Sequence, residues 1–419
     1  MVLEKIKQKF SKEYRDVKKC IVPYSGGLDS SIVASLLKDL GIEIITVTLD
    51  LGEGRDLKEI ERKAKSLGSK KHYTVSSKDE FVRDYIYRAI KTNCLHEGYL
   101  NSEALSRPLL VKYLVETAIK ENAQAVAHGG TGRGNDQIRI DNGVRALAPH
   151  LRIIAPIRDW DIQRDEEIDY ALKKRFIKEA EMPQFSKDEN LWGRVVRSGP
   201  IENPEKEIPE EAFRWTTPVE KTPDKPTYVE LEFARGIPIA IRILDSKRKL
   251  ITDEVGTSVI SVLNRVAGAN GIGRIDTIED KTVGLKIRVG MEAPAASIII
   301  TAHGELEKFI LTANELNFKP TVDQLWNKIV YEGGWYSPLK EELDAFVDKT
   351  QEIVSGKVMV KLFKGSFEIM GRSSKNALYD VYLSSYGKES VWDQQEARAF
   401  AKLYGLEDVI AYLIKKHSG

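Results

Sequence analysis

The segment 24–31 (YSGGLDSS) has the composition of an anion-binding turn. Its two glycines allow the backbone to approach an anion closely. A helical pattern follows them, so unpaired N–H groups and a positive dipole end would lie beside that anion. The lysine of a G-x-x-x-x-G-K-[ST] loop is absent, so we do not expect the turn to hold β- and γ-phosphates for transfer. An ordinary Gly-Gly turn is the alternative, but the whole string favours a phosphate-binding loop.

A second glycine-rich segment, residues 128–139 (HGGTGRGNDQIR), follows an apolar stretch at 125–127. Ligands of open α/β sheets bind where strands end at their carboxyl edge. Polar side chains among glycines at such an edge suit a small zwitterion with an amine and carboxylates. A flexible polar loop is the alternative. It is the weaker hypothesis, because two glycine-rich loops are expected at strand ends of one sheet.

Short apolar runs alternate with helical patterns over the first part of the chain. We expect strands at 20–24, 43–49, 71–75, 123–127 and 153–156, and helices at 30–40, 56–67 and 109–121. This alternation is typical of an α/β fold with a mostly parallel sheet covered by helices on both faces. Such a sheet would bring the ends of the first and fourth strands, and therefore both glycine-rich segments, to one edge.

The pattern changes near residues 182 and 183, and a proline-rich connection follows over 198–227. Alternating apolar residues then predict strands at 227–234 and 237–244, a helix at 257–270, and a further strand at 296–301. Residues 394–416 predict an amphipathic terminal helix. We therefore expect an α+β second domain that ends in a helix.

Composition limits the possible functions. The chain has 419 residues, of which 42% are hydrophobic, and its 64 basic and 63 acidic residues leave a net charge of +1. That balance argues against a general nucleic-acid binder, which needs a basic excess. Two cysteines are too few for a disulfide scaffold or a Cys-only zinc site and fit a cytoplasmic location. No secretory signal and no apolar run of about 18 residues is present, so we expect no membrane partner.

Several motifs carry a family resemblance. SGGLDSS resembles the pyrophosphate-binding loop of the N-type ATP pyrophosphatases. The second glycine-rich segment resembles the argininosuccinate synthases, as do residues 188–194 (DENLWGR), 273–276 (GRID) and 292–296 (EAPAA). The match runs in order from about Cys20 to the C-terminal helix. It implies a nucleotide-binding domain at 20–182, an α+β synthetase domain at 183–393 and an oligomerisation helix at 394–419, with residues 1–19 as an N-terminal extension.

The resemblance also implies a reaction. The ureido oxygen of citrulline would attack the α-phosphorus of ATP and release pyrophosphate. The amine of aspartate would then displace AMP to give argininosuccinate, a step of arginine biosynthesis. Such steps need positioning and charge stabilisation. Mg²⁺ would be bound through the phosphates and keep several waters, so no protein metal ligand is expected. A cytoplasmic homotetramer is implied as well.

Site residues follow by position. The resemblance implies catalytic roles for Asp29, Arg107 and Asp136 and aspartate contacts from Thr131, Asn135 and Asp136. The ATP site would comprise Tyr24, Ser25, Gly26, Gly27, Leu28, Asp29, Ser30, Ser31, Leu49 and Gly129. The citrulline site would comprise Tyr99, Asn135, Arg139, Ser186 and Glu279, with Val195 and Met291 at two further contact positions.

The departures from the family pattern cluster in the citrulline pocket. Val195 and Ile287 replace serines, Met291 replaces a tyrosine, and Glu103 replaces a threonine. Each lost hydroxyl would cost about 1–3 kcal/mol of binding if nothing compensates. Two hypotheses follow: a divergent enzyme that uses citrulline, or a paralogue that joins aspartate to another ureido or carbonyl acceptor. A tRNA-modifying enzyme is a remote alternative, because it would want paired cysteines and a basic surface. A non-catalytic nucleotide-binding protein is equally remote.

Overall fold

The computed structural model describes residues 13–176, 184–387, 391 and 393–417. The chain forms two compact units, Met1–Asn376 and Ala377–Gly419. Most of the predicted N-terminal extension (residues 1–12) lies outside the described residues, as does the predicted change near residues 182 and 183.

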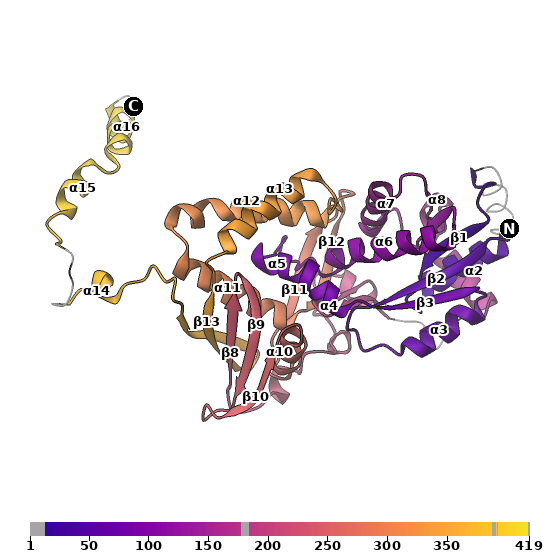
Figure 1. Cartoon of the computed structure of the whole chain (residues 1–419), viewed down its shortest axis with the longest axis horizontal. Helices are drawn as coiled ribbons and strands as arrows, with labels where there is room; N and C mark the ends of the chain where they lie inside the picture. Colours follow the sequence, from indigo (N-terminus) through magenta and orange to yellow (C-terminus); the bar gives the residue numbers. More distant parts are fainter. Residues whose placement is uncertain (1–12, 177–183, 388–390, 392, 418–419) are drawn as a thin grey trace. The chain divides into compact units, whose positions relative to one another are not determined.

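A five-stranded parallel sheet forms the first part of the larger unit (Figure 1). Its strands are β1 (Lys19–Pro23), β2 (Glu43–Asp50), β3 (Lys71–Ser76), β4 (Ala125–Ala127) and β5 (Arg152–Ile154). Their order is β3-β2-β1-β4-β5, and every neighbouring pair is parallel. The predicted α/β fold is confirmed.

Helices cover both faces of this sheet because side chains alternate along each strand. Ile21 packs in one core with residues of α6, whereas Cys20 and Val22 pack in another with residues of α2. The helices of this part are α2 (Leu28–Asp39), α3 (Leu57–Ser66), α4 (Lys78–Glu80), η1 (Phe81–Ile86), α5 (Tyr87–Lys91), α6 (Ser102–Glu121), α7 (Asp136–Leu147), α8 (Pro156–Asp159) and α9 (Arg164–Lys173).

The helix α6 begins at Ser102, earlier than the expected start at residue 109, and it continues through Pro108. A proline biases the residue before it, here Arg107, away from helical geometry. Burial overrides that bias here, since Ala104, Leu105 and Leu109 all pack in the core. The longer helix is what brings Glu103 and Arg107 onto one rigid element.

Two antiparallel sheets follow. One has the order β11-β12-β7-β6 and the other the order β10-β9-β8-β13-β14. Their strands are β6 (Ser186–Asn190), β7 (Gly193–Arg197), β8 (Thr227–Ala234), β9 (Ile237–Leu244), β10 (Leu250–Val255), β11 (Arg274–Asp280), β12 (Lys286–Glu292), β13 (Gly356–Phe363) and β14 (Ser366–Ser373). The helical elements are η3 (Gly199–Glu202), η4 (Glu210–Ala212), η5 (Val219–Lys221), α10 (Ser258–Ala269), α11 (Pro294–Ile310), α12 (Ala313–Tyr331) and α13 (Pro338–Gln351).

The expected strand at 296–301 is wrong, because these residues lie inside α11. A short apolar run with three consecutive isoleucines has the same pattern in a buried strand and in a buried helix. Pro294 at the start of the segment favours a helix, since its fixed φ suits the first helical turn. The helix packs its apolar face in the large core with residues of β8 and β13.

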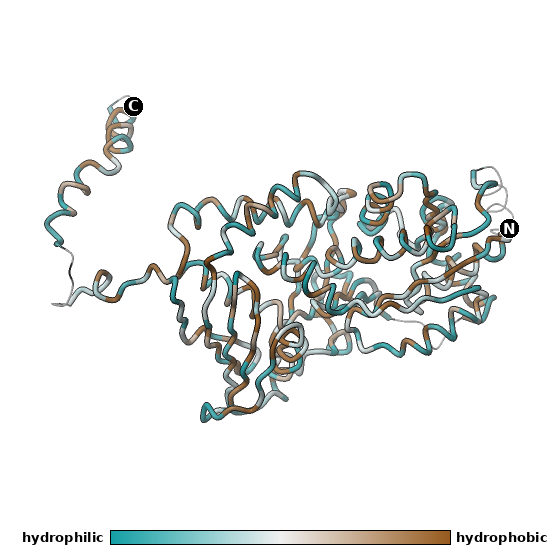
Figure 2. The backbone as a smooth tube through the Cα atoms, in the orientation of Figure 1, coloured by the Kyte–Doolittle hydropathy of each residue, from teal (hydrophilic) through white to brown (hydrophobic). Residues whose placement is uncertain are grey.

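The smaller unit contains α14 (Val381–Ser384), α15 (Ala397–Leu403) and α16 (Leu406–His417). The single terminal helix expected at 394–416 is therefore two helices. The break falls at Gly405, which has φ +75°. Figure 2 shows that hydrophobic residues recur along α15 and α16. Their side chains, such as Phe400 and Ile410, are exposed in this unit. Within the part of the chain that the structure describes, no helix is long and apolar enough to cross a membrane.

Candidate active site

A cleft with about 250 Å³ of free volume lies at the carboxyl edge of the parallel sheet. The strands β1 and β4 are neighbours in the sheet, with Ile21 paired to Val126, and the chain leaves them toward opposite sides. Such a switch point is where open α/β sheets bind ligands. The cleft is lined, among others, by Tyr24, Ser25, Asp29, Ser30, Leu49, Ser106, Arg107, His128, Gly129, Gly130, Asp136 and Asp188.

The first glycine loop connects β1 to α2. Gly26 has φ +75°, a conformation that favours glycine. Gly27 is the N-cap of α2 and provides no capping side chain, so the first N–H groups of the helix lack a side-chain acceptor. Ser31 Oγ donates to Gly27 O at 2.8 Å and lies 3.2 Å from Tyr24 Oη. These bonds hold the loop in the shape of an anion cradle.

The predicted ATP residues divide into two groups. Six of them line the cleft: Tyr24, Ser25, Asp29, Ser30, Leu49 and Gly129. The other four belong to the same loop but are not among the lining residues: Gly26, Gly27, Leu28 and Ser31. The Asp29 carboxylate lies 2.8 Å from Arg164 Nη1.

The two glycine loops approach each other closely. A Cβ at Gly129 would lie 3.4 Å from Val33 Cγ2 and 3.5 Å from Asp29 Cβ. Both are ordinary van der Waals distances, so the second loop lies directly beside the start of α2. The contact brings the first and the second glycine loops to one cleft.

His128 fixes the shape of the second loop. Its Nδ1 accepts the N–H of Gly130 at 3.0 Å, so the ring proton lies on Nε2, which donates to Asp141 Oδ1 at 2.9 Å. Asp141 also accepts from Arg158 at 3.1 Å. Burial raises the pKa of Asp141, but its bonds with His128 and Arg158 outweigh burial and hold that pKa below its ordinary value.

Four charged side chains meet beside the second loop. Arg107 Nη2 donates to Asp136 Oδ2 at 2.7 Å and to Asp188 Oδ2 at 2.5 Å, and Arg139 Nη1 donates to Asp136 Oδ1 at 3.1 Å. Burial raises the pKa of Asp136, but Arg107 and Arg139 outweigh burial and hold that pKa below its ordinary value. Burial raises the pKa of Asp188 despite Arg107. The cluster can therefore offer a guanidinium to a carboxylate and an ionised carboxylate to an amine.

A second charged group, which we call the Glu–Arg–Glu network, comprises Tyr99, Glu103, Arg197, Glu279 and Tyr331. Arg197 donates to both oxygens of Glu103, through Nη1 to Oε1 and through Nη2 to Oε2 at 2.7 Å. Its Nη2 also lies 3.3 Å from Glu279 Oε1. Tyr99 Oη donates to Glu103 Oε2 at 3.1 Å, and Tyr331 Oη donates to Glu279 Oε2 at 3.1 Å.

The structure brings most of the predicted citrulline residues to this network. Tyr99 and Glu279 belong to it, and Ser186 is the cross-strand neighbour of Arg197. Val195 and Met291 pair across β7 and β12 and are completely buried.

Of the other residues predicted in segment 128–139, Arg139 and Asn135 also approach Tyr331 of this network, whereas Thr131 does not. Arg139 lies 5.1 Å from the centre of the Tyr331 ring, and Asn135 Oδ1 accepts the N–H of Thr282 at 3.1 Å. Thr131 is exposed and does not line the cleft.

Several contributors were missed from the sequence. Arg197 was detectable, because it follows Val195 by two residues and so shares its face of β7. Asp188 begins the motif at 188–194, but that motif did not predict its contact with Arg107. Tyr331 comes from α12, and no local pattern links it to Glu279 or Arg139.

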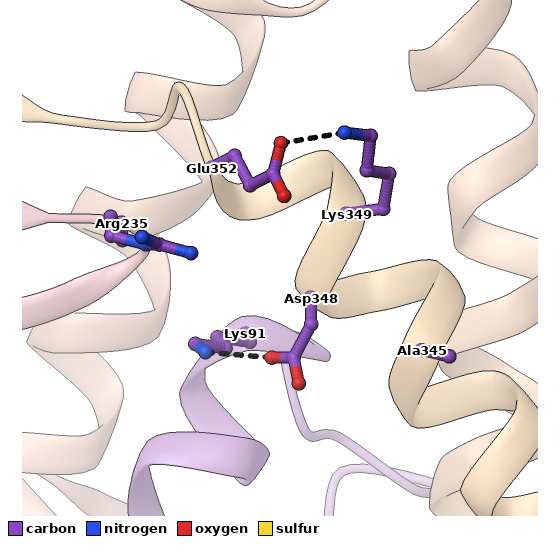
Figure 3. Close-up of a pocket in the computed structure, with 6 residues that line it drawn as sticks. All are labelled: Lys91, Arg235, Ala345, Asp348, Lys349 and Glu352. Atoms are coloured by element: carbon purple, nitrogen blue, oxygen red, sulfur yellow. Dashed lines mark hydrogen bonds and ion pairs between the residues drawn. The ribbon is translucent and has the colours of Figure 1, made fainter.

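A separate pocket of about 300 Å³ is lined by Lys91, Arg235, Ala345, Asp348, Lys349 and Glu352 (Figure 3). Lys91 pairs with Asp348 at 2.7 Å and Lys349 with Glu352 at 2.8 Å. This pocket contains no residue of either glycine loop. We therefore place the candidate chemistry in the cleft.

Metal binding by the protein itself has no candidate site in the described ranges, where no group of three or more His, Cys, Asp or Glu side chains could hold an ion.

Comparisons with known proteins agree over nearly the whole chain. Residues 19–177 match the family model described as the arginosuccinate synthase N-terminal HUP domain, and residues 185–411 match the arginosuccinate synthase C-terminal domain. The argininosuccinate synthase of Pyrococcus furiosus is 46% identical over 94% of both chains. That of Methanocaldococcus jannaschii is 46% identical over 94% of this chain and 98% of its own, and that of Dictyoglomus turgidum is 45% identical over 95% and 98%. With its two glycine loops joined at one switch point and these relatives along its length, the chain belongs to the argininosuccinate synthase family.

Proposed function

We propose that this chain is an ATP-dependent carbon–nitrogen ligase that condenses citrulline with aspartate to give argininosuccinate, AMP and pyrophosphate. The observation that carries the proposal is the meeting of the two glycine loops at the carboxyl ends of β1 and β4, next to the Arg107–Asp136 pair. The names of the relatives favour citrulline over another ureido or carbonyl acceptor.

The first loop would hold the leaving pyrophosphate. The uncapped N–H groups at the start of α2 would be its donors, and Ser25 and Ser30, which line the cleft, could add their hydroxyls by exchanging their present bonds within the loop. An oxygen–phosphorus bond forms at the α-phosphorus while the bond to the β-phosphate oxygen breaks, so negative charge grows on the pyrophosphate. Donors fixed before the reaction stabilise such charge most effectively.

Mg²⁺ fits this site as a companion of ATP. The nearest carboxylate of the first loop, Asp29, is already paired with Arg164. Phosphate oxygens and water are the ligands that Mg²⁺ prefers when a protein offers few. The ion would neutralise charge on the phosphates.

The second loop would hold aspartate. Asp136 is ionised, so it can accept hydrogen bonds from the aspartate ammonium, and Arg107 can exchange its carboxylate partners for a substrate carboxylate. A carboxylate with a lowered pKa is a poor proton acceptor. Asp136 would therefore orient the nitrogen of aspartate, which gives up its protons to water, toward the adenylated carbon. The new carbon–nitrogen bond forms as the carbon–oxygen bond to AMP breaks.

Assembly and location extend the proposal. Exposed apolar side chains on α15 and α16, such as Leu403 and Leu413, support a homotetramer in which these helices pack on a neighbouring subunit. Two free, buried cysteines support a reducing cytoplasm. The two family models support a nucleotide-binding domain over 20–182 and a synthetase domain after it.

An isotope experiment tests the reaction. The purified chain is incubated with ATP, Mg²⁺, aspartate and citrulline that carries a heavy oxygen in its ureido group. We expect AMP, pyrophosphate and argininosuccinate in equal amounts, with the heavy oxygen transferred to AMP. A reaction without aspartate is the control for idle nucleotide cleavage. Release of ADP and orthophosphate, or unlabelled AMP, would refute the proposal.

A further inference from the structure

We propose that Arg197, held in place by Glu103, binds the carboxylate of the acceptor amino acid and so determines which acceptors the enzyme selects. The inference rests on the proposed function, because it takes citrulline as the acceptor. It assigns this recognition to the Glu–Arg–Glu network, a feature of side chains that lie far apart in the sequence.

The position of Arg197 supports this role. Ser186 lies directly opposite it on β6, so the two residues are cross-strand neighbours. Val195 shares its face of β7, and Glu279 lies 3.3 Å from its Nη2. Tyr99 reaches it through Glu103. Positions expected to contact citrulline therefore surround Arg197.

Arg197 also has donors to spare. A guanidinium carries five N–H bonds, and the contacts with Glu103 and Glu279 use only Nη1 and Nη2. Its Nε is buried and has no hydrogen-bond partner among the described residues. A buried donor without an acceptor is costly. A ligand carboxylate would remove that cost.

A second cation lies close to this point. Lys281 makes no ion pair within 4 Å among the residues that the structure describes. Burial lowers its pKa, and so does the neighbouring Arg197, while Glu279 acts in the opposite direction. An arriving carboxylate would relieve the repulsion between the two cations.

Because apolar residues occupy positions 195, 287 and 291, Arg197 is the side chain that can offer polar contacts on its face of β7. Val195 and Met291 supply no hydroxyl donor, and Ile287 pairs with Glu279 across β11 and β12. Glu279 is almost completely buried and retains capacity to accept from an ammonium. A guanidinium beside a buried carboxylate is complementary to the zwitterionic head of an amino acid.

Glu103 serves as the positioning residue. Burial raises its pKa, but Arg197 outweighs burial and keeps that pKa below its ordinary value. The ionised carboxylate grips two nitrogens of the guanidinium at once, which fixes the plane of that group. A planar group fixed in advance loses less entropy when it binds a carboxylate.

The test compares Arg197→Gln with the unchanged enzyme on three ligands. Citrulline has the carboxylate and the ammonium, N-carbamoylputrescine lacks the carboxylate, and 5-ureidopentanoate lacks the ammonium. We measure kcat/KM for citrulline from aspartate-dependent pyrophosphate release, and inhibition constants of the two analogues against citrulline. The variant should lower kcat/KM for citrulline and raise the inhibition constant of 5-ureidopentanoate, each by about 10- to 100-fold. The inhibition constant of N-carbamoylputrescine should change by less than about threefold.

Two further variants separate recognition from folding. Arg197→Gln leaves Glu103 without its charge partner. A double variant that also carries Glu103→Gln removes both charges, so it should fold, and its ligand preference should match that of the Arg197→Gln single variant. Arg242→Gln removes a cation from an exposed ion pair on β9 and should change none of the three constants.

The outcomes are distinct. Equal weakening of all three ligands, or selective weakening of N-carbamoylputrescine, would overturn the role of Arg197 in carboxylate binding. Failure of the unchanged enzyme to make argininosuccinate from citrulline would instead overturn the proposed function. Selective loss of both carboxylate-bearing ligands, in the single or the double variant, supports the inference.

Discussion

The two halves of the proposed site, the nucleotide half and the acceptor half, are built from different materials. The nucleotide half consists of a glycine turn, a helix start and hydroxyl groups, all within residues 24–31 and 128–131. The acceptor half consists of charged side chains from α6, β7 and β11 that pair with one another, together with a tyrosine from α12 that donates to one of the carboxylates. Backbone donors need only the right local conformation. Paired charges need several distant segments in register, and they are costly when one partner is lost.

Arg107 lies where the halves meet, and its loss should have the largest effect. Arg107→Ala leaves Asp136 and Asp188 facing each other without their common cation. We expect kcat/KM for aspartate to fall by about 100-fold or more. The free energy of unfolding should fall by about 2–3 kcal/mol, since both carboxylates are partly exposed. Steady-state kinetics and urea unfolding measure both.

The matched control for this change is Arg145→Ala. Arg145 is an exposed residue of α7 that pairs with the buried Asp141, which keeps its bonds to His128 and Arg158 when Arg145 is removed, and a pair with one exposed partner contributes about 0.3–0.5 kcal/mol. An Arg107→Ala enzyme with an unchanged KM for aspartate would show that the cluster does not bind that substrate.

Gly26 tests the backbone half. Gly26→Ala places a Cβ at φ +75°, 3.1 Å from Ile60 Cγ1, which costs about 1–2 kcal/mol of strain. We expect the KM for ATP to rise about tenfold as the loop shifts, with little change in the KM for aspartate. Initial rates with each substrate varied in turn give both constants.

Gly41→Ala provides the comparison, because Gly41 also has positive φ (+82°) but nothing lies within 4 Å of its Cβ position. Both variants should lose a similar free energy of unfolding, whereas only Gly26→Ala should raise the KM for ATP. A similar rise in the KM for ATP in both would mean that global stability controls the loop.

His128 tests whether a side chain supports the backbone half. His128→Phe keeps the ring shape but removes the acceptor for the Gly130 N–H and the donor to Asp141. We expect the KM for ATP to rise by about 5- to 10-fold, which corresponds to about 1 kcal/mol for the lost bond to the Gly130 N–H. Substitution of the exposed His150 by Gln is the control. Equal KM values for His128→Phe and the unchanged enzyme would remove His128 from loop positioning.

Asp323 shows what buried charge does outside the cleft. It lies with Lys319, Glu307 and His303 in a network that includes no residue of the cleft lining. Burial raises the pKa of Asp323 to about 6, although Lys319 acts against it. A folded pKa above the unfolded value contributes stability below about pH 4 that is lost as pH rises through about 6.

We therefore expect the unchanged enzyme to lose stability relative to Asp323→Asn between pH 4 and pH 7, by about 2 kcal/mol. Urea unfolding at several pH values measures this difference, and kcat/KM should stay unchanged. A difference that grows in the opposite direction would mean that Asp323 is ionised more readily in the folded state.

Part of this architecture was predictable because it is local. The order of apolar runs indicated the parallel sheet, and the α/β fold is confirmed. The strand expected at 296–301 failed because a buried helix and a buried strand look alike over six residues. The terminal helix expected at 394–416 missed its break at Gly405, since one glycine inside an amphipathic pattern is compatible with an unbroken helix.

The sequence by itself determined the family and the fold class, and it predicted the first glycine loop, because a glycine turn before a helix takes its shape from its own backbone. Only the tertiary structure decided how the acceptor half is built. Arg197, Glu103, Glu279 and Tyr331 come from four elements, and no periodicity along the chain records which charges will meet. The physical reason is that a salt bridge depends on distance in space, whereas a sequence pattern reports only the direction in which each side chain points.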